Sequence, residues 1–191
     1  NIAVGSNADP KTRPGLAHFL EHMLFLGTQK YPDAGAYKAY IQSHGGHMNA
    51  YTAHENTNYY FDIASDNLEP ALDRFAQFFI APLLDEKYVD RERHAVHSEY
   101  KSKIRDDRRR SYAVTKQVMN PNHSFSHFDV GTIKKDWNFK PLHPSEISVE
   151  IKSYFALRSQ RYKRDIISAF RKTEAIYQRN RQRQRDIDDL I

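Results

Sequence analysis

Residues 15–27 read GLAHFLEHMLFLG, an apolar stretch with two histidines and a glutamate in its middle. Its apolar side chains recur at the spacing of one helix face, which predicts a buried helix that begins near Gly15 and ends near Gly27. The residues on this face are Leu16, Phe19, Leu20, Met23 and Leu24. Burying an imidazole or a carboxylate is costly unless the group finds a partner. The polar residues of this helix therefore need partners, and a metal ion would be one.

His18 and His22 are four residues apart, so a helix places them on one face, where they can bind one ion together. Glu21 lies within a turn of His18 and beside His22, close enough to reach a water molecule on that ion. The three residues form HxxEH, the inverted zinc-protease motif. Zinc bound by two histidines and one carboxylate, with an open position, is typical of catalytic sites. In a chain with 10 histidines the motif alone is only moderately specific, and a third ligand must exist.

The best source of a third ligand is the sequence DEKYVDRERHAVHSEYKSK at residues 85–103, the first part of a predicted long helix. Tyr88, Glu92, Ala95 and Glu99 form one stripe at helical spacing, and a core-facing stripe should carry no carboxylates. One glutamate can be the ligand and the other can support a ligand histidine from behind. The residues alone leave Glu92 and Glu99 as equal alternatives. Five other histidines are weaker ligand candidates, more typical of ordinary surface residues: His44, His47, His54, His94 and His97.

The rest of the pattern mixes helices and strands. Residues 47–65, HMNAYTAHENTNYYFDIAS, read as two strands around a tight turn at residues 54–56. A short helix precedes them at about residues 36–45, and an amphipathic helix follows at residues 68–84. A long helix is expected from about residue 85 to 119. These elements predict an α+β fold, an antiparallel sheet with helices packed on it.

The composition excludes sites that need cysteine and makes some classes of binding partner less favoured. The chain has 191 residues and no cysteine, which rules out disulfides and thiolate zinc sites. It contains no apolar run of the roughly 20 residues that a membrane span needs, so we expect no membrane partner. The net charge of +5 comes from the end of the chain, because residues 152–191 hold 11 Lys and Arg against 5 Asp and Glu. Acidic residues are interspersed there, which makes nucleic-acid binding an unfavoured alternative.

Three blocks resemble the N-terminal catalytic domain of the pitrilysin/insulysin family of zinc metallopeptidases. They are GLAHFLEHMLFLGTQKYP, HGGHMNAYTAHENTNYYFDI and LDRFAQFFIAPLLDEKYVDRERHAVHSEY, and the resemblance covers about residues 1–133. It implies one Zn²⁺ per chain, with Glu99 as the third ligand beside His18 and His22. It also implies that Glu21 is the general base and that Glu92 supports activity.

The resemblance further implies a peptide substrate and zinc-dependent endopeptidase activity. Family members bind peptides by adding a strand to a sheet edge, and the matching contacts here are Asn49, Ala50 and Tyr51. Family members are also much longer, or dimers of shorter chains, so a further domain or a second chain is expected to close the site. The alternative is a non-catalytic remnant or interaction subunit that still binds zinc.

The resemblance divides the chain into two expected parts. Residues 1–135 would form a partial metallopeptidase domain, incomplete at both ends, and residues 136–191 a divergent, basic, helical tail. Bacterial relatives are often periplasmic and eukaryotic ones cytosolic, so the compartment, periplasmic or cytoplasmic, stays open.

Overall fold

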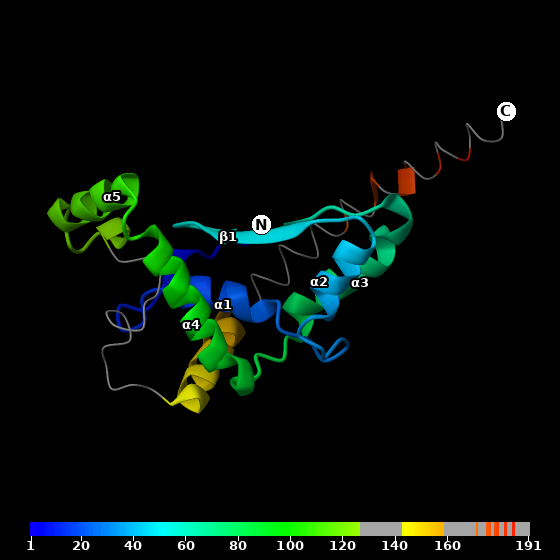
Figure 1. The fold of residues 1–191 in the computed structure, drawn as a ribbon, viewed down its shortest axis with the longest axis horizontal. Coiled ribbons are helices and arrows are strands. Elements are labelled where there is room, and N and C mark those ends of the chain that lie inside the picture. Colours follow the sequence, from blue (N-terminus) through cyan, green and yellow to red (C-terminus); the bar gives the residue numbers. More distant parts are fainter. Residues whose placement is uncertain are drawn as a thin grey trace.

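The structure is a computed structural model that describes residues 1–126, residues 143–158 and a few positions between 171 and 185. The described part is α+β, as predicted, with helices packed against one antiparallel hairpin (Figure 1). The main elements are α1 (Leu16–Leu24), α2 (Ala36–Ser43), β1 (Met48–Thr52), β2 (Thr57–Phe61), α3 (Leu68–Ile80), α4 (Glu86–Lys103) and α5 (Asp107–Val118). Short 3₁₀ turns form at Ser6–Ala8, Ser65–Asn67 and Ser124–Ser126, and residues 144–158 are helical.

The hairpin has one occupied edge and one open edge. β1 and β2 pair antiparallel, with Asn49 opposite Tyr60 and Thr52 opposite Thr57. Ile2 forms a bridge with Thr57 on the far side of β2. Within the described residues no strand pairs with the other edge of β1. An unpaired strand edge of this kind can pair with an added strand.

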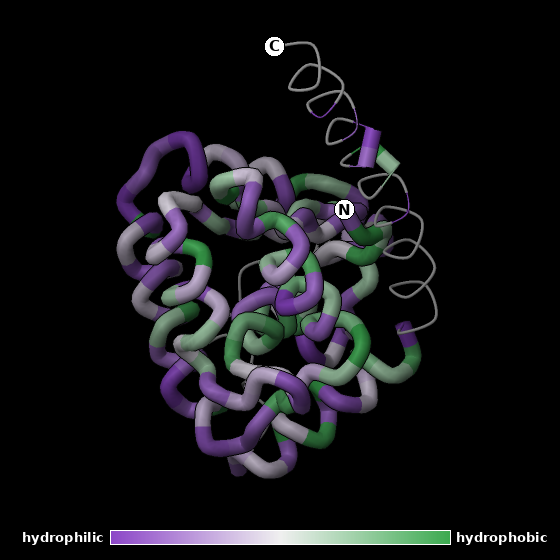
Figure 2. The backbone as a smooth tube through the Cα atoms, turned by 90° about the vertical axis from the view of Figure 1, so that its right-hand side faces the viewer, coloured by the Kyte–Doolittle hydropathy of each residue, from purple (hydrophilic) through white to green (hydrophobic). Residues whose placement is uncertain are grey.

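Helix α1 lies in the middle of the core, below the hairpin (Figure 1). Met23 and Leu24 are completely buried, and α3 contributes Phe78 and Phe79 from the other side. Phe25, next to the end of α1, packs edge-on against Phe78. In Figure 2 hydrophilic segments form much of the outer turns, and hydrophobic segments lie toward the middle. The helix with the HxxEH motif is therefore held by packing on several sides.

Residues 144–158 pack into the same core. Ile147 and Ile151 are completely buried, and the Ser148 hydroxyl donates a hydrogen bond to the Leu84 carbonyl oxygen at 3.1 Å. Arg13 and Glu150 form an ion pair at 2.7 Å. The expected boundary near residue 135 lies outside the described residues, and the two-part division of the chain stays a prediction.

The predicted long helix at residues 85–119 is wrong in one respect, because it is two helices. Helix α4 ends at Lys103, and α5 begins at Asp107 with the Asp106 carboxylate accepting a hydrogen bond from the Arg109 N–H at 2.9 Å. This side-chain cap favours a new helix start.

No described helix has both the length and the apolar character that crossing a membrane requires.

Candidate metal centre

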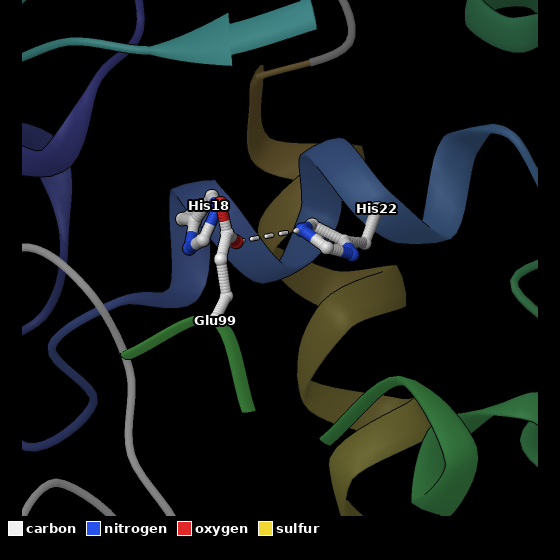
Figure 3. Close-up of side chains that lie close together, drawn as sticks. All are labelled: His18, His22 and Glu99. Carbon is white, nitrogen blue, oxygen red and sulfur yellow. Dashed lines mark ion pairs between the residues drawn. The ribbon is translucent and has the colours of Figure 1, made fainter. Parts of the chain in front are cut away.

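The two histidines of α1 project from the same face of the helix, as their spacing predicts (Figure 3). Their ring centroids are 4.9 Å apart and the rings are nearly perpendicular. The side chains of His18 and His22 are 14% and 24% exposed, so both rings lie in a half-buried position that an ion can still reach.

Helix α4 packs against α1 and carries the carboxylate that faces both rings. Its buried face is formed by Val89, Glu92 and Val96, with Glu99 one turn further on. The predicted stripe is wrong at Ala95, which is exposed while its neighbour Val96 faces the core. The sequence spacing places Glu92 and Glu99 about two helical turns apart on this face.

Glu99 is the carboxylate that the structure brings to the two imidazoles. Its Oε2 atom lies 3.4 Å from His18 Nε2 and 3.7 Å from His22 Nε2 (Figure 3). One donor atom from each of the three residues lies within 4.8 Å of the other two. Four tetrahedral ligands at about 2.1 Å from a zinc ion would be about 3.4 Å apart. The spacing of the three donors therefore fits a zinc ion.

The chemistry of the donors fits as well. Glu99 Oε2 is buried and accepts no hydrogen bond from any residue that the structure describes. Contacts with His18 and His22, together with an ion pair to Lys103 at 2.5 Å, hold the pKa of Glu99 well below its usual range. The carboxylate is thus ionised, and one of its oxygens is directed at two imidazole nitrogens. Two nitrogens and one anionic oxygen are ligands that zinc prefers.

Glu92 lies behind His22. Its Oε2 atom is 3.2 Å from His22 Nδ1, and its Oε1 atom accepts a hydrogen bond from Arg91 Nε at 2.9 Å. Burial would raise the pKa of Glu92, but its contacts with His22 and Arg91 outweigh burial and lower it. An ionised Glu92 favours a proton on Nδ1, which leaves Nε2 of His22 able to bind a metal ion. Of the two glutamates that the residues alone left open, only Glu99 lies among the three donors.

Without a metal, the imidazole of His22 lies in a strongly anionic environment. Burial alone would lower its pKa, but the hydrogen bond with Glu92, the Glu99 carboxylate 3.7 Å away and the charge of Glu21 raise that pKa to about 9. The site therefore stabilises a positive charge at the position of the ring.

Glu21 lies on the hairpin side of α1 and is only 7% exposed. Its Oε2 atom accepts a hydrogen bond from the Thr52 hydroxyl in β1 at 2.5 Å. Thr52 was missed by the sequence analysis, although it shares the inward face of β1 with Met48 and Ala50. A hydroxyl on a face that should be apolar was the available signal.

The residues expected to contact a peptide lie on β1, with Asn49 and Tyr51 exposed and Ala50 half-buried. The Asp62 N–H donates to the His47 carbonyl oxygen at 2.9 Å, so alternation along the ladder turns the Ala50 N–H away from β2. That N–H donates to the side-chain oxygen of Asn49 at 2.9 Å. The backbone of Ala50 thus lies at the open edge.

Other histidines lie outside the cluster. His44 Nδ1 is 2.7 Å from the Tyr40 carbonyl oxygen, and His54 contacts the Ser6 and Tyr112 hydroxyls. His18, His22 and Glu99 form the one potential metal-binding group found in the described part of the chain.

Comparisons with known proteins show the family to which the chain belongs. Residues 1–123 match the model of the family described as Insulinase (Peptidase family M16). The insulin-degrading enzyme of Mus musculus is 50% identical over 131 residues, which are 69% of this chain and 13% of that protein. Insulin-degrading enzyme-like 2 of Arabidopsis thaliana is 44% identical over 155 residues, 80% of this chain and 15% of that protein.

The solved structure of pitrilysin aligns with a TM-score of 0.74 and 38% identity, over 81% of this chain and 16% of that one. This chain thus spans only about one seventh of the length of these relatives. The family match covers more than half of the described fold and includes both helices that carry the three donors. The chain therefore belongs to the insulinase family, peptidase family M16, whose members are zinc metallopeptidases.

Proposed function

We propose that this chain forms a zinc-dependent endopeptidase site that binds one Zn²⁺ through His18, His22 and Glu99. The observation that carries the proposal is the convergence of three donor atoms within 4.8 Å, from two helices far apart in sequence. The match to a family of metallopeptidases supports it.

The residues around the donors have distinct roles in this proposal. A zinc ion bound there supplies a Lewis acid that lowers the pKa of water and polarises a carbonyl group. Glu21 accepts a proton from the attacking water and passes it to the leaving amine, as a general base and then a general acid. Thr52 donates to Glu21 Oε2, which leaves Oε1 to exchange the proton. Glu92 orients the His22 ring from behind.

The proposed substrate is an extended peptide paired with the open edge of β1. The Ala50 N–H would release the side-chain oxygen of Asn49 and donate to a carbonyl oxygen of the peptide instead. The Ala50 backbone would then form the hydrogen bonds that join the two strands. Asn49 and Tyr51 would contact the substrate from the exposed face. Because the chain spans a small part of its relatives, we propose that a further domain or a second chain covers the peptide.

The test combines zinc content with hydrolysis of a small unfolded peptide. The purified chain should bind about one zinc per molecule and cleave the peptide, and Glu21→Gln should retain zinc and lose cleavage. A folded chain that binds no zinc at micromolar concentrations would overturn the proposal.

A non-catalytic, zinc-binding unit is the second candidate. The open edge of β1 favours it, because an unpaired strand edge can bind a partner without any catalysis. Stoichiometric zinc with no cleavage, by the wild type or Glu21→Gln, would support this candidate.

A further inference from the structure

The first turn of α1 is capped from a distance. Its N-cap residue is Gly15, which has φ of 87° and offers no side chain to the free N–H groups of the helix. Asp9 replaces that cap, because its Oδ2 accepts from the Gly15 N–H at 2.7 Å and its Oδ1 from the Ala17 N–H at 2.8 Å. The candidate ligand His18 is the next residue along the helix. Uncapped helix ends fray, so the order of this turn depends on Asp9.

Asp9 is in turn held by the helix at residues 144–158. The Tyr154 hydroxyl lies 3.4 Å from Asp9 Oδ1, and Arg158 donates to the carbonyl oxygen of Ala8 at 2.8 Å. The Arg158 guanidinium stacks on the Tyr154 ring at 3.8 Å from its centroid. Ile151, on the same helix, is completely buried. The packing of this side chain in the core therefore fixes the helix that carries Tyr154 and Arg158.

We propose that Asp9 is a positioning residue for the metal site, which sets the place of His18, and that Tyr154 and Arg158 hold Asp9 in position. The proposal rests on the proposed zinc site for its effect on the metal. It gives residues 144–158 a role in the site, although they contribute none of the three donors.

A general loss of helix stability would have a different signature. Asp106 caps α5 through the Arg109 N–H at 2.9 Å, and α5 carries none of the donors. Asp106→Ala thus removes a comparable cap without touching the site. Loss of Asp9 should loosen the first turn, which contains His18, more than the next turn, which contains His22.

The experiment uses the full chain and compares Asp9→Ala and Asp9→Asn with Asp106→Ala. Zinc affinity is measured by competition with a chromogenic chelator, and the visible spectrum of the Co²⁺-loaded protein reports ligand geometry. Asp9→Ala should weaken zinc binding by about tenfold and alter the Co²⁺ bands, as removal of groups that orient ligands does. Asp9→Asn, which keeps one acceptor oxygen, should be intermediate. Asp106→Ala should match the wild type in both readouts.

Wild-type affinity and spectrum in Asp9→Ala, or an equal loss in Asp106→Ala, would overturn the positioning role. If Asp9→Ala does not fold, Asp9→Asn is judged on the same readouts. A wild type that binds no zinc refutes the proposed function. In that case amide hydrogen exchange decides the role of Asp9, because faster exchange at Gly15 and Ala17 alone supports it and unchanged exchange refutes it.

Discussion

His22 contacts two carboxylates through opposite ring nitrogens, with Nδ1 at 3.2 Å from Glu92 and Nε2 at 3.7 Å from Glu99. Because the two carboxylates lie on opposite sides of the ring, removing each negative charge should weaken zinc binding to a different extent. Glu92→Gln should weaken zinc binding by about 10–100-fold, the usual effect of a residue behind a ligand. Glu99→Gln, which removes a ligand, should have a larger effect. Chelator competition measures both, with the exposed Glu86→Gln in the same helix as a control. A larger loss in Glu92→Gln would reverse the assignment.

The raised pKa of His22 predicts a pH-dependent stability of the metal-free protein. The pKa of the ring is about 9 in the folded state and about 6.5 in the unfolded state. Protonation of His22 therefore stabilises the fold. This contribution is complete below pH 6.5 and is lost as the pH rises through 9, with a loss on the order of 3 kcal/mol. Urea unfolding in a chelator, between pH 6 and 10, should show the decline.

His22→Gln is the control for that experiment and should flatten the curve over the same range. Zinc should also flatten it, because a bound metal requires the neutral ring. A wild-type curve parallel to that of His22→Gln would contradict the assignment of the raised pKa.

The hydrogen bond from Thr52 to Glu21 predicts a specific loss of rate. Thr52→Val keeps the shape of the side chain and removes the donor, so the Glu21 carboxylate loses its fixed orientation. Peptide hydrolysis should slow by about tenfold while zinc affinity stays unchanged. Thr52→Ser, which retains the hydroxyl, should recover most of the rate. Equal rates in the Val and Ser variants would argue against an orienting role.

Two residues of the helix at 144–158 provide a matched pair for stability. Ile151 is completely buried, whereas Leu157 is 81% exposed. Ile151→Ala should lower the free energy of unfolding by about 2–5 kcal/mol, because it leaves a cavity in the core. Leu157→Ala should change it little. Denaturant unfolding measures both, and equal effects would place this helix outside the core.

Much of the fold was predictable because its signals are local. The hairpin follows from two short runs rich in aromatic and Thr residues around a turn, and α1 from apolar residues at helical spacing. The pair His18 and His22 follows from the same spacing. The break before Asp107 was missed because the charged sequence on both sides favours helix equally. Only the capping capacity of Asp106 distinguishes that point.

The parts that were not predictable depend on contacts between distant residues. From the residues alone Glu92 and Glu99 were equivalent, since both lie on one helix face and only the packing of α4 on α1 separates them. Asp9 and Tyr154 meet across 145 positions of the chain, and no periodic pattern records such a contact. The family resemblance selected Glu99, the glutamate that lies among the three donors, while the metal role of each residue stays a proposal.

The distance along the chain between the donors has a consequence for folding. From His22 to Glu99 the chain runs 77 residues, so an ion bound to both closes a long loop. Closing such a loop is entropically costly for an unfolded chain, and the complete donor set exists only after α1 and α4 have docked. Zinc should therefore bind late in folding and slow unfolding rather than speed folding. The metal would then act as a removable crosslink, which makes the lifetime of the native state depend on the zinc supply.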